Sequence, residues 1–428
     1  MELFRCARAI AGGNEQRDFA FAVEGARITA AGPAPQLQAQ FPEARITAFA
    51  QDVLVVPGFI NGHSHAYQIL LRGWADDLPF ERWRSDALYT VIPGLTPDEV
   101  YWTFRLAFDE MLAAGITTVA EFFYLNGAGN AHAERAIQAA SDSGIRLMFA
   151  RAWMDAASAP AAFRETPALA AQRTAELMES FPGIDICIAP HSLHAASPEM
   201  LRAAAAFARE RGCMMHVHAA EAPYEGAQTL ERFGATPVTL LDRLGALNER
   251  SVVIHAIHVS DAEKDLLAAC GARVIHNPMT NQYLGDGICD VSKLLALGVP
   301  VGLGTDADVK PSLFEEMRAA SLLQKIARLD GSALGAAAAY GLGTAQGARA
   351  LAVDAGDLRA GAFADFALIE TRGIDAWTPA VNALVYRAEN SWVRETFVGG
   401  RRVRVRSAAP PQQAREALAP IYGRLQLK

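Results

Sequence analysis

Cysteine is scarce in this sequence, with five residues widely separated along 428 positions. Their odd number and mostly apolar neighbours exclude a disulfide framework and predict reduced, buried thiols, so we expect a cytoplasmic protein. Positive charge is also in deficit, because 39 Lys and Arg stand against 47 Asp and Glu and give a formal net charge of -8. Nucleic acids and anionic membrane surfaces attract proteins of the opposite balance, and we expect neither as a partner.

Long hydrophobic runs are absent as well. No apolar stretch approaches the roughly 20 residues of a membrane-spanning helix, and the first residues show no basic segment followed by an apolar run. The composition is nevertheless 51% hydrophobic and only 20% charged. These proportions predict a soluble protein with a large buried core, built as one elaborated domain or as two.

Short apolar runs recur through the middle of the chain, and each ends in polar residues before a longer amphipathic stretch. The eight runs lie at residues 53–60, 115–122, 144–151, 184–191, 213–218, 251–256, 272–277 and 299–306. One stretch between them, 197–212, begins at Ser197, a favoured N-cap, and ends at Gly212, a favoured C-terminal stop. Eight strands alternating with helices predict an α/β fold of the (β/α)8 TIM-barrel type. An open doubly wound sheet is the alternative, although no G-x-G-x-x-G motif follows an early strand.

Both ends of the chain differ from this pattern. Residues 1–56 and 357–406 contain short alternating segments around glycine-containing turns, which predict β-hairpins. We expect the two segments to form one discontinuous β-sandwich domain beside a barrel at 57–356, followed by a linker and a helix at 407–428. Alternating arginines at 401–406 predict the solvated face of an edge strand.

Histidine is rare too, yet nine of the ten histidines lie at or just after predicted strand ends. His63 and His65 are two residues apart, so in an extended segment both imidazoles face the same side and can bind one metal ion. Later strand ends supply His218, Glu221, His255 and Asp306. Because the carboxyl ends of barrel strands meet at one face, these residues predict a catalytic site for a first-row metal.

Four motifs carry a resemblance to a known family: PGFINGHSHA, HVHAAE, HAIH and GLGTDAD. They are similar to motifs of the amidohydrolase superfamily, in its aminohydrolase (deaminase) branch, and the similarity extends over nearly the whole chain. The resemblance implies that one Zn²⁺ per chain, or alternatively Fe²⁺, is bound by His63, His65, His218 and Asp306. It also implies that Glu221, His255 and Asp306 transfer protons.

The reaction implied by this family is hydrolysis of an amidine or imine C=N centre with release of ammonia. A metal lowers the pKa of bound water towards about 7 and so provides hydroxide at neutral pH. In this scheme His255 orients the water, Asp306 accepts its proton, and Glu221 protonates the substrate nitrogen.

Further positions resemble one subgroup, the N-formimino-L-glutamate deiminases. Gln68, Arg84, Tyr124 and His191 match substrate contacts of that subgroup, and His194 stands where it carries a second arginine. Arg84 could hold a carboxylate through its planar guanidinium group. On this basis we expect these five residues to bind a small N-formimino-L-glutamate-like substrate.

Other stretches, at 70–83 and 312–325, are more similar to deaminases of adenosine derivatives and of guanine, so deamination of an aromatic heterocycle is the alternative. We expect Trp74 and Trp83 in the first stretch to pack within their loop. Hydrolysis of an amide, displacement of chloride from a triazine, and a non-enzymatic metal-binding role also stay open. In each enzymatic case we expect a homodimer that binds a small molecule.

Overall fold

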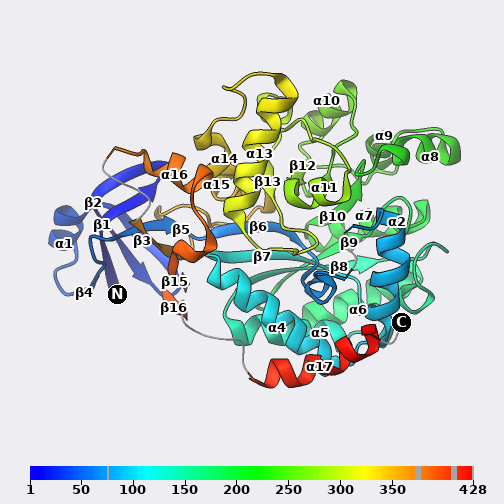
Figure 1. Cartoon of the computed structure of the whole chain (residues 1–428), viewed down its shortest axis with the longest axis horizontal. Helices are drawn as coiled ribbons and strands as arrows, with labels where there is room; N and C mark the ends of the chain where they lie inside the picture. Colours follow the sequence, from blue (N-terminus) through cyan, green and yellow to red (C-terminus); the bar gives the residue numbers. More distant parts are fainter. Residues whose placement is uncertain (75–76, 372–376, 406–411, 427–428) are drawn as a thin grey trace.

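The computed structural model describes residues 1–74, 77–371, 377–405 and 412–426, which form a barrel and a separate sheet (Figure 1). The barrel contains eight parallel strands: β6 (Phe59–Ser64), β7 (Ile116–Phe123), β8 (Arg146–Trp153), β9 (Asp185–Pro190), β10 (Met215–Ala219), β11 (Ser251–His255), β12 (Arg273–His276) and β13 (Val301–Leu303). They follow one another in chain order around the barrel. The predicted α/β fold of the TIM-barrel type is therefore confirmed.

Helices follow the barrel strands and cover their outer face (Figure 1). The longer ones are α4 (Pro97–Ala113), α5 (Ala131–Ser143), α6 (Pro167–Ser180), α7 (Pro198–Arg211), α8 (Pro223–Phe233), α10 (Asp261–Ala269) and α13 (Leu313–Arg328). Shorter ones are α9 (Pro237–Arg243), α11 (Pro278–Leu284), α12 (Val291–Ala296), α14 (Ala336–Leu342) and α15 (Ala345–Leu351). Helix α16 (Ala380–Tyr386) comes after the barrel in the chain and packs against α13 and α14. As predicted, Ser197 caps α7 by accepting a hydrogen bond from the Met200 N–H, and Gly212 ends it with φ +66°.

The barrel closes between its first and last strands through a small set of backbone contacts. Ser64 and Asp306 form a parallel bridge, and the His65 N–H donates to the Asp306 carbonyl at 2.8 Å. The N–H groups of Thr305 and Asp306 both donate to the His63 carbonyl at 3.0 Å. The seam of the barrel thus lies at the predicted metal-binding residues.

A second sheet combines the two ends of the chain, as the sequence predicts. Its strands are β1 (Glu2–Ala11), β2 (Asn14–Glu24), β3 (Arg27–Pro33), β4 (Arg45–Ala48), β5 (Val53–Pro57), β14 (Phe366–Glu370), β15 (Val393–Val398) and β16 (Arg401–Val405). Phe4 on β1 contacts Phe397 on β15 with ring centroids 6.2 Å apart. Three strand spacings separate these strands in the sheet order, about 14 Å if the sheet were flat, so the sheet curls around its phenylalanines. The domain boundaries proposed from the sequence stay predictions.

The prediction for the first barrel strand is wrong in part. Residues 53–57 form β5, which pairs antiparallel with β14 in the terminal sheet, and only Phe59–Ser64 enters the barrel. Gly58 separates the two strands, and a Cβ there would lie 2.1 Å from the Thr117 hydroxyl oxygen. A continuous apolar run therefore serves two sheets, because glycine allows close approach at the junction.

The structure describes part of the C-terminal region. Helix α17 (Gln412–Gln426) lies against α4. Strand β16 is the last in its sheet, and Arg401 and Arg402 on it are exposed, as expected for an edge strand. Arg406 and the predicted linker at 407–411 lie outside the described residues. None of the helices in the described ranges is both long and apolar enough to cross a membrane.

Candidate active site

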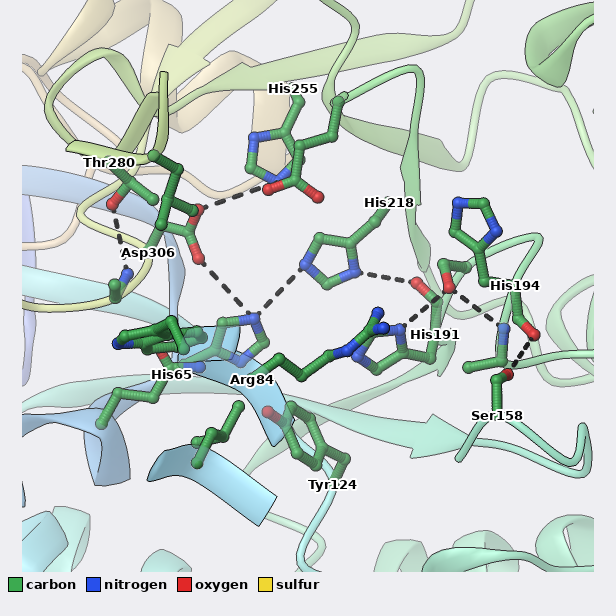
Figure 2. Close-up of a pocket in the computed structure, with 18 of the residues that line it drawn as sticks. His65, Arg84, Tyr124, Ser158, His191, His194, His218, His255, Thr280 and Asp306 are labelled. Atoms are coloured by element: carbon green, nitrogen blue, oxygen red, sulfur yellow. Dashed lines mark hydrogen bonds and ion pairs between the residues drawn. The ribbon is translucent and has the colours of Figure 1, made fainter. Parts of the chain in front are cut away.

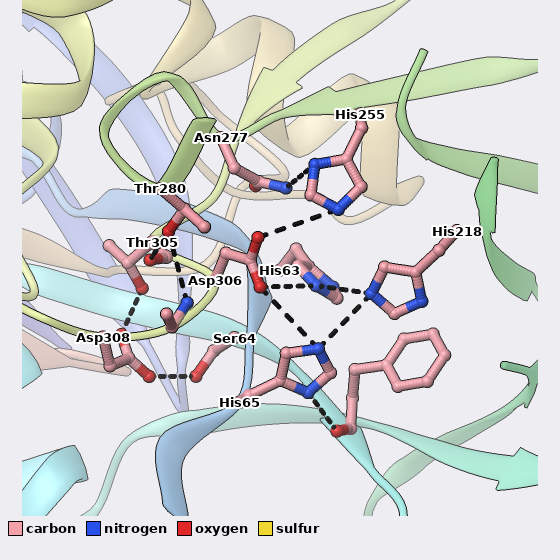
Figure 3. Close-up of polar contacts among 12 residues, drawn as sticks. His63, Ser64, His65, His218, His255, Asn277, Thr280, Thr305, Asp306 and Asp308 are labelled. Carbon is pink, nitrogen blue, oxygen red and sulfur yellow. Dashed lines mark hydrogen bonds and ion pairs between the residues drawn. The ribbon is translucent and has the colours of Figure 1, made fainter. Parts of the chain in front are cut away.

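The predicted metal ligands meet at the carboxyl ends of the barrel strands (Figure 3). The His218 Nε2 atom lies 3.2 Å from Nε2 of His63 and 3.3 Å from Nε2 of His65. Asp306 Oδ1 lies 3.4 Å from the first of these histidines and 3.7 Å from the second. Four ligand atoms on a tetrahedron with zinc–ligand distances of about 2.0–2.1 Å would be about 3.3 Å apart.

Hydrogen bonds on the far side of two rings show which nitrogens face this cluster. His65 Nδ1 lies 2.9 Å from the Phe122 carbonyl, and His218 Nδ1 lies 2.8 Å from the His191 carbonyl. A carbonyl only accepts, so each Nδ1 carries the proton and each Nε2 presents a lone pair.

Burial keeps these imidazoles neutral. Loss of solvation lowers the pKa of His65 well below its ordinary value and that of His218 to about 4. Neutral rings with lone pairs converging at 3.2–3.3 Å repel one another, and a cation between them removes the repulsion. The donor set therefore fits a first-row metal ion such as zinc.

Glu221 and His255 lie beside the metal-binding cluster. His255 Nε2 is 3.3 Å from Glu221 Oε1 and 3.7 Å from Asp306 Oδ2. The side-chain amides of Asn277 and Asn281 lie 3.3 and 3.1 Å from Nδ1 of His255 and donate to it. Nε2 therefore carries the proton, and His255 presents a donor to the two carboxylates, unlike the metal-facing histidines.

Burial and neighbouring carboxylates favour a proton on Glu221. Loss of solvation, followed by the negative charges of Asp286, Asp306 and Glu225, raises the pKa of Glu221 well above its ordinary value. Burial also raises the pKa of Asp306, and a bound cation would oppose that shift. An acid that keeps its proton near neutral pH is suited to general acid catalysis.

Glu225 holds the turn that carries Glu221. Its carboxylate accepts hydrogen bonds from three consecutive backbone N–H groups, those of Ala220 at 2.9 Å and of Glu221 and Ala222 at 3.3 Å each. Burial opposes ionisation of Glu225, but the nearby His194 and the backbone donors outweigh it and lower its pKa. The carboxylate therefore stays charged and fixes the backbone of Glu221.

Strained backbone is concentrated at these strand ends. Nine non-glycine residues of the described chain have positive φ, and five of them lie at the ends of β10, β11 and β13. They are Ala220, His255, Ala256, Asp306 and Asp308. Such conformations cost about 1–3 kcal/mol each and persist where the surrounding structure fixes them, which is common at functional sites.

Beneath the site, Ser64 connects three barrel strands. Its hydroxyl lies 2.9 Å from Glu121 of β7 and 2.6 Å from Asp308, which follows β13. Figure 3 shows the contact with Asp308. The Ser64 hydroxyl has one proton, so it can donate a hydrogen bond to one carboxylate. A second hydrogen bond forms when the other carboxyl group is protonated and donates to the hydroxyl oxygen. Burial raises the pKa of Glu121 well above its ordinary value and that of Asp308 to about 6, which makes this second hydrogen bond possible.

A pocket opens above the metal-binding cluster and encloses about 790 Å³, part of it open to solvent (Figure 2). All five predicted substrate-binding residues line it: Gln68, Arg84, Tyr124, His191 and His194. Figure 2 shows Arg84 extending across the pocket beside His191, with Tyr124 below them. Trp83 packs against the core and also lines the pocket, whereas Trp74 is 40% exposed.

The structure thus brings together every residue that the sequence proposed for the site. His63 lies beneath the pocket and is fully buried, and the others line the pocket. Sequence reasoning missed Glu225, Asn277, Thr280 and Asn281. The segment NPMTN after the seventh barrel strand offered a signal, because its polar residues follow a strand end, but Glu225 offered none.

Comparisons with known proteins agree with this geometry. The model of the Amidohydrolase family matches residues 54–403. A 5'-deoxyadenosine deaminase of Methanothermobacter thermautotrophicus is 34% identical over 365 residues, which are 81% of each chain. A 5-methylthioadenosine/S-adenosylhomocysteine deaminase of Natronomonas pharaonis is 35% identical over 83% of this chain and 82% of its own.

Solved structures show the same architecture. An adenosine deaminase from Xanthomonas campestris with bound zinc superposes with a TM-score of 0.91 at 26% identity, over 100% of this chain and 98% of its own. An atrazine chlorohydrolase from Arthrobacter aurescens has a TM-score of 0.89 at 23% identity, over 98% of this chain and 100% of its own, and indicates the fold alone. These relatives favour the heterocycle alternative over the N-formimino-L-glutamate-like substrate that the sequence motifs suggested.

Proposed function

The chain belongs to the amidohydrolase family, and on that premise we propose that it is a zinc-dependent aminohydrolase that removes the amino group of a heterocyclic amine of the adenine-nucleoside type. The observation that carries the proposal is the convergence of three neutral histidines and Asp306 within 3.2–3.7 Å, with Glu221 and His255 beside them. The deaminases of adenine nucleosides among its relatives support the substrate class.

In this proposal one zinc ion is held by His63, His65, His218 and Asp306. When bound, zinc lowers the pKa of water and polarises the carbon–nitrogen centre, which makes attack at neutral pH possible. The Phe122 and His191 carbonyls contribute by fixing the rings of His65 and His218 with Nε2 towards the ion.

The remaining acidic and basic groups divide the proton transfers. The Nε2–H of His255 orients the attacking water, whose proton passes to Asp306, 3.7 Å from that nitrogen. Glu221 keeps its proton because burial and neighbouring carboxylates raise its pKa, and it donates that proton to a ring nitrogen next to the reacting carbon. Asp306 passes the proton that it accepted to the exocyclic nitrogen, which leaves as ammonia. The carbon keeps the oxygen as a carbonyl once the remaining hydroxyl proton returns to Asp306.

In this proposal the residues that line the pocket bind the substrate. We propose that Gln68, Tyr124 and His191 make hydrogen bonds to the heterocycle and that Trp83 packs against it. Arg84 and His194 line the same pocket and provide donors for the more distant part of the substrate. With His194 in place of a second arginine, the pocket has fewer fixed positive charges than a dicarboxylate would require.

The test is release of ammonia by the zinc-loaded protein from a panel of amines. The panel contains 5'-deoxyadenosine, 5'-methylthioadenosine, S-adenosylhomocysteine, guanine and N-formimino-L-glutamate. We expect turnover of the adenine nucleosides, with one ammonia released per nucleoside consumed. Turnover confined to N-formimino-L-glutamate would overturn the substrate class, and silence on the whole panel with one zinc bound per chain would overturn the reaction.

A further inference from the structure

The catalytic pocket continues into a second cavity of about 400 Å³, part of it open to solvent. The two cavities share the residues at their junction: Gln68, Trp83, Thr280, Leu284 and Ala307. The rest of the second cavity is lined by Leu71, Arg72, Tyr283 and Val309. We call this second cavity the side lobe.

The walls of the side lobe are mainly apolar. Leu71 is buried, and Leu284, Val309 and the ring of Trp83 add further apolar surface. Among the described lining residues the charged side chain is Arg72, whose Nε donates to the Asp308 carbonyl and whose Nη1 donates to Glu110, each at 2.7 Å, while its Nη2 is buried without a hydrogen-bond partner. Such a space favours a hydrocarbon group over a polar one.

The side lobe opens next to a proton-transfer residue. Ala307, which lines both cavities, directly follows Asp306 in the chain. Thr280 fixes this segment, since its hydroxyl donates to the Thr305 carbonyl at 3.2 Å and accepts from the Ala307 N–H at 3.3 Å. The mouth of the side lobe therefore lies beside the carboxylate to which we assign the proton of the attacking water.

An unpaired acceptor lies at the same junction. Gln68 is 5% exposed and lines both cavities, and its Oε1 atom is buried without a hydrogen-bond partner in the described part of the protein. A buried acceptor of this kind calls for a donor from a ligand. A secondary amine offers one N–H for such an acceptor and one alkyl group for the apolar walls.

We propose that the side lobe takes an alkyl group carried on the leaving nitrogen, so that the enzyme also hydrolyses N-alkylated amino heterocycles; this inference rests on the proposed function. Water adds its oxygen to the ring carbon and the bond from that carbon to the exocyclic nitrogen breaks. The electron pair of that bond goes to the nitrogen, which takes up a proton and leaves as a primary alkylamine. The ring carbon keeps the oxygen as a carbonyl, and no oxidant or reductant takes part.

The experiment compares 5'-deoxyadenosine with its N6-methyl and N6-propyl derivatives, using the zinc-loaded full chain. Ammonia and alkylamine are quantified separately, and kcat/KM is measured for each substrate. Val309→Phe fills the side lobe, and Val309→Ala is the matched variant that widens it; Val309 lines the side lobe but not the catalytic pocket.

We expect one propylamine per N6-propyl substrate. Because filling an apolar pocket discriminates against the groups it held, Val309→Phe should lower the kcat/KM ratio of N6-propyl to unsubstituted substrate at least about tenfold. Val309→Ala should keep or raise that ratio.

The outcomes separate the two proposals. Turnover of 5'-deoxyadenosine without turnover of either N6-alkyl derivative would overturn the side-lobe inference and leave the proposed function intact. Release of propylamine with an unchanged ratio in Val309→Phe would show that the alkyl group lies elsewhere and would also overturn it. Failure of all three substrates would contradict both proposals.

Discussion

Replacing Glu225 by glutamine should test whether Glu225 positions Glu221, because the effect on kcat can be compared with the effect on the free energy of unfolding. The Glu225 carboxylate accepts one N–H through Oε2 and two through Oε1, and a glutamine keeps only one of these oxygens. Its NH₂ group would then face at least one backbone N–H, donor against donor. A buried N–H without an acceptor costs about 1–3 kcal/mol, which is the expected loss in free energy of unfolding.

The catalytic consequence is expected to exceed what this loss of stability explains. Glu225 holds the backbone of Glu221 directly, and a catalytic group displaced by about 1 Å can lose on the order of a hundredfold in rate. We therefore expect Glu225→Gln to lower kcat between about tenfold and a hundredfold with a smaller change in KM. Ammonia release at saturating substrate and urea unfolding of the same preparation, with zinc content measured on each, give both quantities.

Glu99→Gln is the matched control. Glu99 is also buried at the start of a helix, where its carboxylate accepts the Thr96 N–H at 2.8 Å, but α4 carries none of the site residues. It should lose less free energy of unfolding than Glu225→Gln, because a glutamine keeps one oxygen for this single N–H, and kcat should stay within about twofold, because α4 carries no residue of the site. A kcat for Glu225→Gln no lower than that of Glu99→Gln, or lost zinc that accounts for the whole decrease, would refute the reasoning.

Four further predictions follow from the site. Removal of metal by a chelator should abolish ammonia release and lower thermal stability, and one equivalent of zinc should restore both; equal activity after chelation would contradict this. Glu221→Gln should lower kcat at least about a hundredfold while zinc content and the circular dichroism spectrum stay unchanged. Arg84→Met should raise KM about tenfold or more for S-adenosylhomocysteine, which carries a carboxylate, but hardly for neutral 5'-deoxyadenosine; equal changes for the two would exclude a carboxylate contact. The pKa of Glu225 is lowered in the folded state, so its ionised carboxylate stabilises the fold at pH values above the ordinary 4.5, and this stabilisation is lost as pH falls below 4.5. The difference in free energy of unfolding between the native chain and Glu225→Gln should therefore shrink as the pH is lowered below 4.5.

The barrel strands could be predicted because their physical signal is local. A buried parallel strand reads as a short apolar run, and its active-site end reads as a polar residue such as His218 or Asp306. The first run was misassigned because residues 53–57 and 59–64 are both apolar, and the change of sheet at Gly58 depends on its close approach to Thr117.

The contacts that support the site were harder to predict, because they join side chains to backbone or to distant segments. Glu225 binds three backbone N–H groups, which every residue type except proline carries, so no motif of side chains in the sequence indicates its role. The place of Trp83 in the pocket wall could not be predicted, because it depends on how residues 77–95 lie over the barrel. The substrate class was hard to predict for a related reason, since the matching residues Gln68 and Arg84 line the pocket but do not define the shape of the ligand.

The seam of the barrel has a consequence for how the chain folds. The first and last barrel strands meet through one isolated bridge and a few hydrogen bonds, and Ser64 and Asp308 at this seam are 244 residues apart in the chain. The entropy of closing so long a loop makes this contact expensive until the intervening strands are in place. We therefore expect closure of the barrel and assembly of the active site to occur together, late in folding. A cation bound by His63, His65 and Asp306 would bind only the closed barrel and hold its two ends together.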